Sequence, residues 1–229
     1  MKEKVSAIKN GLDPFYNSFL EYLPFDNSRL FFHKRAIELA SPNLSTRHLR
    51  YVYECIIQYI KSQYINSNIQ IEDFSIFYQS VQKEKNLIQR ISNKKIDSFD
   101  DWYLLESLFS NIKITINETY LVIQARILSQ ILPNLCPPID ISHGKHFFLK
   151  KTFEEKDIYN QVKEYTKLIT EFYAPLAKEK LVQHFFNKYK KTTTWNTSYP
   201  RFLNHLVIGC VIYNKKDPEE HRPLIEAVI

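Results

Sequence analysis

A carboxylate and two imidazoles recur at intervals of three residues in the middle of the chain. They belong to Asp140, His143 and His146. Zinc and other divalent metals accept such a donor set, but a structural zinc site needs a fourth ligand, and Cys136 is the only candidate nearby. We favour the alternative, in which Asp140 caps a turn or accepts backbone N–H groups and the histidines are surface or packing residues. We therefore expect no metal and no cofactor.

A second group with binding chemistry lies near residue 190. Lys188, Lys190 and Lys191 are followed by three threonines and Trp195. Basic side chains can hold a phosphate backbone while an aromatic ring stacks on a base, so this pattern is typical of nucleic-acid binding. The alternative is the C-terminus of a helix, where lysines interact favourably with the helix dipole, followed by a capping loop.

The positive charge of the chain is concentrated in one segment. The net charge is +6, and residues 141–191 contain 11 basic and 6 acidic side chains, against 16 and 15 in residues 1–140. Lys145, Lys150 and Lys151 belong to this segment. Because such an excess attracts polyanions through counterion release, we predict a nucleic-acid-binding face within residues 141–195. A solvated helix surface is the alternative.

Catalytic signatures are sparse. No Walker A pattern, GxGxxG, HExxH, GxSxG, CxxC pair or EF-hand loop occurs, which argues against the mechanisms that these motifs represent. Arg201 and His205 are four residues apart, so they share a helix face and could position and protonate a phosphate. Their spacing is one residue shorter than the Arg-x4-6-His pattern of HEPN ribonucleases, and Arg29 and His33 repeat it. No catalytic residue is assigned, and whether the protein is an enzyme stays open.

The elements that position these residues are predicted to be helices. The chain has only three glycines, and apolar residues recur with a period near 3.6, so the fold should be all-α. The clearest stripe runs from Leu49 to Tyr64, on a helix that starts near Ser45 or Thr46. We expect eight or nine helices, at 13–22, 27–40, 45–66, 72–92, 99–110, 117–132, 154–173, 175–190 and 198–214.

Prolines mark the irregular parts of the chain. Three prolines and a glycine should prevent a continuous helix over residues 133–151, which predicts one long proline-containing loop. Pro175 should kink or divide the helical segment 154–190. The length of 229 residues fits a single compact domain spanning 1–229, with a subdivision near the 133–151 loop as the alternative.

The compartment is predicted from what the sequence lacks. The N-terminus has no signal-peptide apolar stretch, and the longest apolar run, 206–213, is too short to cross a bilayer. Cys55, Cys136 and Cys210 lie in apolar runs and are expected to be reduced core residues. We therefore expect a cytoplasmic protein that does not contact membranes.

Two segments resemble signatures of a group of uncharacterised helical proteins from bacteria and archaea. One is Ile131-Leu-Pro-Asn-Leu-Cys-Pro-Pro-Ile-Asp140, followed by two phenylalanines, and the other is Trp195-Asn-Thr-Ser-Tyr-Pro-Arg-Phe-Leu-Asn204. The resemblance implies a helical fold, carries no known function, and suggests that the two segments face one another. A polar cluster would then form at the mouth of the helical core from Asp140, Thr197, Ser198, Arg201 and Asn204.

Three functional hypotheses follow. The first is a helical module that binds nucleic acid, with its basic face in 141–195, as an accessory in nucleic-acid processing. The second is an enzyme or small-ligand-binding protein with a pocket around Asp140, Arg201 and Asn204, supported by convergent polar groups on an apolar framework. The third is a scaffold that binds a partner protein.

Overall fold

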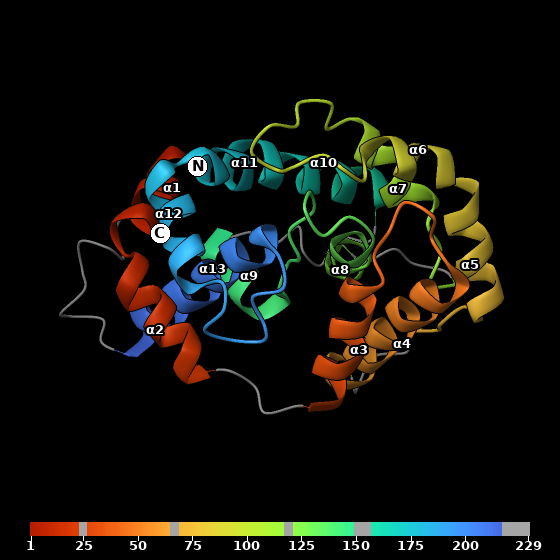
Figure 1. Cartoon of the computed structure of the whole chain (residues 1–229), viewed down its shortest axis with the longest axis horizontal. Helices are drawn as coiled ribbons and strands as arrows, with labels where there is room; N and C mark the ends of the chain where they lie inside the picture. The colour runs from red at the N-terminus through yellow and green to blue at the C-terminus, as the bar shows by residue number, and fades with distance from the viewer. Residues whose placement is uncertain (23–26, 65–68, 117–120, 149–156, 217–229) are drawn as a thin grey trace.

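The computed structural model describes residues 1–22, 27–64, 69–116, 121–148 and 157–216, and helices joined by loops make up the described chain (Figure 1). The predicted all-α class is confirmed, and the described ranges contain more helices than the eight or nine expected. Their only strand-like feature is an isolated antiparallel bridge between Ile71 and Thr115. The first elements are α1 (Lys2–Asn10), α2 (Leu12–Tyr22), α3 (Asn27–Glu38), α4 (Thr46–Gln63), α5 (Phe74–Lys83), α6 (Lys85–Ile91) and α7 (Leu104–Asn111). The chain continues with α8 (Leu121–Ile131), α9 (Ile141–Phe148), α10 (Ile158–Leu168), a π-helical turn (Ile169–Tyr173), α11 (Ala174–Lys178), α12 (Lys180–Tyr189) and α13 (Tyr199–Lys216).

Helix α4 forms for the reasons visible in the sequence. Its N-cap is Ser45, whose hydroxyl accepts a hydrogen bond from the backbone N–H of His48 at 3.2 Å. The stripe that begins at Leu49 is buried in its central part, as the periodicity predicts. The predicted helix 72–92 is instead divided at Glu84 into α5 and α6.

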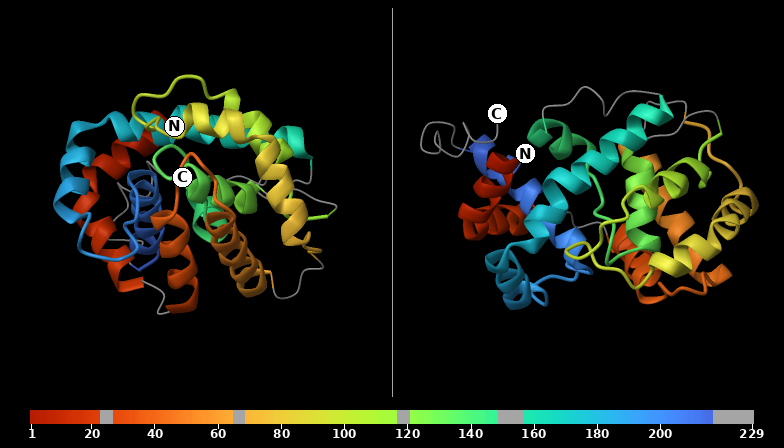
Figure 2. Two further views of the ribbon diagram at one scale, coloured as in Figure 1. Left: turned by 45° about the vertical axis from the view of Figure 1, so that its right-hand side comes forward. Right: turned by 90° about the horizontal axis from the view of Figure 1, so that it is seen from above.

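The helices form two groups side by side, joined across the top by α10 and α11 (Figures 1 and 2). In one group α13 packs against α1, α2, α9 and α11, and in the other α4 packs against α3, α5 and α8. Helix α10 contacts α7 and α8, while the π-helical turn that follows contacts α1. The N-terminal helices therefore belong with the C-terminal ones, and α3 to α8 form the other group.

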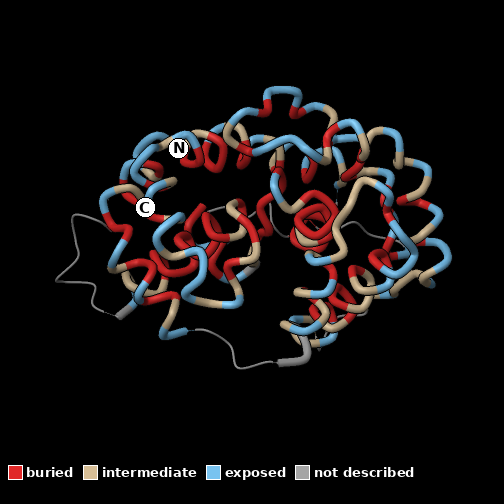
Figure 3. The backbone as a smooth tube through the Cα atoms, viewed as in Figure 1, coloured by how far each residue is buried: buried red, intermediate tan, exposed pale blue. Residues whose placement is uncertain are grey.

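Close packing of α2 on α13 depends on one glycine. A Cβ atom at Gly209 would lie 1.8 Å from the carbonyl oxygen of Phe15, which is far inside van der Waals contact. The buried side chains of both groups form one continuous apolar core, and Figure 3 shows the buried positions facing inward along each helix. None of the described helices combines the length and the apolar composition needed to cross a membrane.

Two predictions about proline were wrong in part. The long loop does not extend over 133–151, because α9 begins at Ile141 and Gly144 lies within it, donating its N–H to the carbonyl of Asp140 at 2.8 Å. The proline-containing loop therefore ends at Asp140. The predicted kink or division at Pro175 lies at neighbouring residues instead, because a π-helical turn, Ile169–Tyr173, interrupts the α-helix just before the proline. This turn widens the backbone, so that the ring is accommodated, and the chain turns only at Glu179. The first residues of the predicted helix 154–173 lie outside the described residues.

Candidate anion-binding cavity

A cavity of about 160 Å³ lies between the two groups of helices. Its walls come from α2 and α13 on one side and from α3, α4 and α8 on the other, with the end of the proline loop between them. Tyr22, whose side chain is exposed, and Ser142 lie toward solvent. The polar groups that define the chemistry of the cavity are His33, Arg126, Gln130, Asp140, Arg201, Asn204 and His205.

Helices α8 and α13 contribute matching sets of side chains. Helix α8 contributes Arg126, Ser129 and Gln130, and α13 contributes three residues at the same spacing. Positions i, i+3 and i+4 share one face of a helix, so each helix directs an arginine and two polar groups into the same space. The set on α13 is Arg201, Asn204 and His205.

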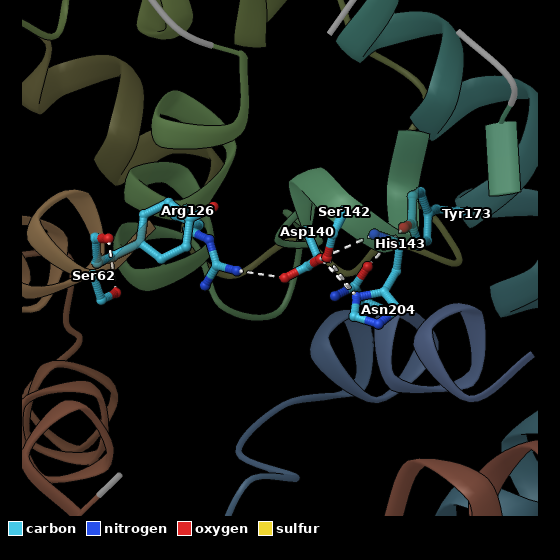
Figure 4. Close-up of polar contacts among 8 residues, drawn as sticks. Ser62, Arg126, Asp140, Ser142, His143, Tyr173 and Asn204 are labelled. Carbon is cyan, nitrogen blue, oxygen red and sulfur yellow. Dashed lines mark hydrogen bonds and ion pairs between the residues drawn. The ribbon is translucent and has the colours of Figure 1, made fainter. Parts of the chain in front are cut away.

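Arg126 is paired. Its guanidinium nitrogen Nη2 lies 3.3 Å from Oδ2 of Asp140, as Figure 4 shows, and the guanidinium carbon lies 3.8 Å from the centre of the Tyr59 ring. Both members of the ion pair have side chains that are only 18% exposed. The pair joins α8 to the end of the proline loop.

Asp140 caps α9 as well as pairing with Arg126. Its Oδ1 accepts from the backbone N–H of His143 at 3.1 Å, from the His143 ring nitrogen Nδ1 at 2.7 Å and from the Ser142 hydroxyl at 2.8 Å (Figure 4). Burial alone would raise the pKa of Asp140, but the hydrogen bonds from His143 and the charge of Arg126 outweigh it and hold the pKa well below its usual range. Asp140 is thus an ionised carboxylate whose acceptor capacity is largely used within the protein.

Arg201 differs from Arg126 in having no such partner. Among the described residues its guanidinium makes no ion pair and no hydrogen bond, and its Nε is buried. Its nearest ring contact is Trp195, whose centre lies 5.7 Å from the guanidinium carbon. Burial, followed by repulsion from Arg126, lowers the pKa of Arg201 below its usual value. The cavity therefore holds a cation that the described part of the protein does not neutralise.

The remaining members of the predicted polar cluster have structural contacts. Asn204 accepts a hydrogen bond from the buried Tyr173 hydroxyl at 3.1 Å (Figure 4). Ser198 accepts from the backbone N–H of Arg201 at 3.4 Å and so caps α13. Thr197 contacts His33 Nε2 through its hydroxyl at 2.8 Å. The structure therefore brings Asp140, Arg201 and Asn204 to one cavity and places Thr197 and Ser198 behind it.

The residues of the predicted nucleic-acid face lie in several places. Lys188, Lys190 and Lys191 are exposed at the C-terminal end of α12, and Lys145 is exposed on α9. Lys150 and Lys151 lie outside the described residues. Trp195 is not an open stacking platform beside the lysines, because it lines the cavity and its ring is stacked on His33 at 6.2 Å and 12°.

The proposed metal donors do not converge. His143 is held by Asp140, His146 is exposed, and Cys136 is fully buried with a pKa that burial raises to about 12. Across the described ranges, no group of three His, Cys, Asp or Glu side chains has the arrangement of a metal site.

Arg126, His33 and Gln130 are cavity residues that sequence reasoning missed. Arg126 is the one charged residue in the apolar run 121–132, where an unpaired charge would be costly and therefore calls for a partner or a ligand. A second sign is the match between Arg126-Ile-Leu-Ser-Gln130 and Arg201-Phe-Leu-Asn-His205.

Comparisons with protein-family models, with curated proteins and with solved structures find no match to this chain. The assignment of function therefore depends on the chemistry of the cavity.

Proposed function

We propose that the protein binds a small oxyanion, a molecule with a phosphate or carboxylate group, in the cavity between α8 and α13. The observation that carries this proposal is the guanidinium of Arg201, which lines the cavity without an anionic partner among the described residues. A cation removed from water is costly unless it is paired. A bound anion would supply the missing partner.

The charge balance of the cavity supports an anion. Two guanidiniums face it, and among the described residues that line it Asp140 is the only carboxylate. His33 and His205 do not add charge near neutral pH, because burial and the nearby Arg201 lower the pKa of both imidazoles well below the usual value. Two guanidiniums and one carboxylate leave the cavity with one net positive charge, that of Arg201. Its guanidinium is a planar fork of N–H donors, which matches an oxyanion in geometry.

The size of the cavity limits the ligand. A cavity of about 150 Å³ in another protein accommodates benzene, which has six heavy atoms, so the present volume of about 160 Å³ suits an oxyanion with at most a small substituent. Larger ligands would have to extend past Tyr22 and Ser142 toward solvent.

The test is a thermal-shift screen of the purified protein at low ionic strength with phosphate, sulfate and acetate, using chloride as the reference. A ligand that binds only the folded state adds RT ln(1 + [L]/Kd) to the free energy of unfolding, about 2.7 kcal/mol at a hundred times Kd, and so raises the melting temperature. We expect at least one oxyanion to stabilise the wild type and none to stabilise Arg201→Met. Lys188→Gln, which removes an exposed lysine of α12, is the matched control and should respond like the wild type. No shift with any oxyanion would refute the proposal.

We also retain nucleic acid as a second candidate ligand, for a different surface. Lys188, Lys190 and Lys191 are exposed together at the end of α12, where they could contact phosphates by a charge attraction that weakens with salt. This surface is independent of the cavity, so the two proposals can be tested separately.

A further inference from the structure

The imidazole of His205 lies in the cavity wall one helical turn after Arg201. It is 4% exposed, and its ring is stacked on Phe19 with centres 4.0 Å apart and planes 13° apart. Its Nδ1 lies 2.9 Å from Oδ1 of Asn196. The direction of that hydrogen bond decides which ring nitrogen carries the proton.

A chain of hydrogen bonds fixes the orientation of Asn196. The amide nitrogen of Asn196 donates to the carbonyl oxygen of Tyr189 at 3.1 Å and also to the hydroxyl of Tyr16. A carbonyl oxygen can only accept, so the atom that Asn196 presents to His205 is its own oxygen. The Thr192 hydroxyl donates to the same Tyr189 carbonyl at 2.6 Å, which leaves Tyr16 to donate to Thr192 at 2.7 Å and to accept from Asn196.

It follows that Nδ1 of His205 is the protonated nitrogen. A neutral imidazole with a proton on Nδ1 has a lone pair on Nε2. The ring is neutral because it is buried against Phe19 and lies next to the cation of Arg201. Arg126 is the other cation of the cavity, and the carboxylate that lines it, Asp140, is already paired with Arg126. His205 therefore contributes a hydrogen-bond acceptor to a cavity that Arg201 makes attractive to anions.

A second acceptor lies across the cavity on α8. The Gln130 amide nitrogen donates to Sγ of Cys55 at 3.2 Å, and its Oε1 is buried without a hydrogen-bond partner among the described residues. Gln130 and His205 occupy equivalent positions, four residues after the arginine on each helix. Each of these two helices thus carries an arginine and, four residues later, a side chain with a hydrogen-bond acceptor.

From this arrangement we infer that the cavity selects an oxyanion that carries its own O–H donor, which means phosphate, free as hydrogen phosphate or as the singly protonated head group of a small monoester, in preference to sulfate or a simple carboxylate. The inference rests on the proposed function and narrows it. Hydrogen phosphate presents oxygens to Arg201 and its hydroxyl to Nε2 of His205. Sulfate at neutral pH has only acceptor oxygens, so a sulfate oxygen could not donate to Nε2 of His205. Nε2 would then be a buried acceptor without a donor, which weakens binding.

The experiment is isothermal titration calorimetry of the wild-type protein with inorganic phosphate and with sulfate at pH 7 and equal ionic strength. We expect phosphate to bind at least tenfold more tightly than sulfate. Equal affinities, or tighter sulfate binding, would overturn the inference while leaving the oxyanion proposal standing. Absence of binding by phosphate, sulfate and acetate would overturn both.

Two variants assign the preference to one atom. His205→Asn can keep the donor to Asn196 but has no atom at the Nε2 position, whereas His205→Gln can place its amide oxygen there. We expect the preference for phosphate to fall to within about threefold in His205→Asn and to be kept in His205→Gln. A preference for phosphate over sulfate that persists in a folded His205→Asn protein would show that His205 does not accept a hydrogen bond from the phosphate hydroxyl. The wild-type comparison decides the inference if either variant fails to fold.

Discussion

Arg126 and Arg201 line the same cavity from α8 and α13, yet within the described ranges Arg126 alone has a carboxylate partner, Asp140 at 3.3 Å. The two arginines are therefore expected to affect the protein in opposite ways. Arg126 connects α8 to the start of α9 through Asp140, whereas the role we propose for Arg201 is to bind the anionic ligand. Comparing the same substitution at both positions separates structure from binding.

Arg201→Met should make the protein more stable. Methionine keeps much of the apolar volume and removes a partly buried charge that has no partner among the described residues, a change that is often neutral or favourable. We expect the free energy of unfolding to rise by about 1 kcal/mol in a buffer without oxyanions, measured by urea denaturation. A loss of stability in that buffer would show that Arg201 has a structural role instead.

Arg126→Met should have the opposite effect, because it leaves the carboxylate of Asp140 buried without its cation. Removing one member of a buried pair costs about 3–5 kcal/mol, and the partial exposure of this pair reduces the expected loss to about 2 kcal/mol. The measurement is the same urea denaturation. Equal effects at the two arginines would contradict the distinction drawn between them.

Acidification should destabilise the protein before any carboxylate titrates. The pKa values of His33 and His205 are lowered well below 6.5 by burial and by Arg201, so below about pH 6.5 the unfolded chain binds more protons than the folded one. Stability therefore falls as the pH falls from about 7 to about 5, and His205→Gln should flatten that slope. The contribution of Asp140, whose pKa is lowered, is retained in this range and lost only at lower pH. An unchanged slope in the variant would mean that His205 does not titrate as described.

Much of the fold could be predicted from the sequence, but the cavity could not be predicted in full. The apolar period that begins at Leu49 and the scarcity of glycine determine an all-helical chain, because each helix must bury one face. Helix α1 was missed since it is short and has only a few buried side chains, Val5, Ala7 and Ile8 among them. Gly144 was taken as a helix breaker, but the capping bonds of Asp140 start a helix there in spite of it.

The partner of Asp140 shows why the candidate site was only partly predicted. The predicted polar cluster placed Asp140 with Arg201, whereas the structure pairs Asp140 with Arg126, which lies 14 residues earlier on α8. Local pattern cannot tell which of two arginines reaches a carboxylate, because that depends on how α8 and α13 are placed around the cavity. The same limit applies to Trp195, which adjoins the lysines in sequence and contacts His33 in the fold.

Tyr16→Phe should weaken the chain of hydrogen bonds that orients His205. The Tyr16 side chain is 1% exposed, and the change removes its bonds to Thr192 and Asn196 while keeping the ring. We expect a loss of about 1–2 kcal/mol in the free energy of unfolding, with a smaller preference for phosphate over sulfate. Tyr103→Phe, at an exposed tyrosine, is the matched control and should change neither quantity.

Replacing Lys188, Lys190 and Lys191 together by glutamine tests the second candidate ligand. If this surface contacts nucleic acid, the triple variant should bind labelled single- and double-stranded oligomers more weakly whatever their sequence, and its affinity should depend less on salt. Fluorescence anisotropy at about 50 and 200 mM salt measures both effects. Affinity equal to that of the wild type would remove this surface from consideration, without bearing on the cavity.

The most direct test of the account is a calorimetric titration of inorganic phosphate into the wild type and into Arg201→Met, each confirmed to be folded. The account predicts saturable binding to the wild type and an affinity at least tenfold lower in the variant, since hydrogen bonds to a charged group contribute about 1.5–3 kcal/mol. Equal affinity in the two proteins, or no binding of any oxyanion to the wild type, would contradict it.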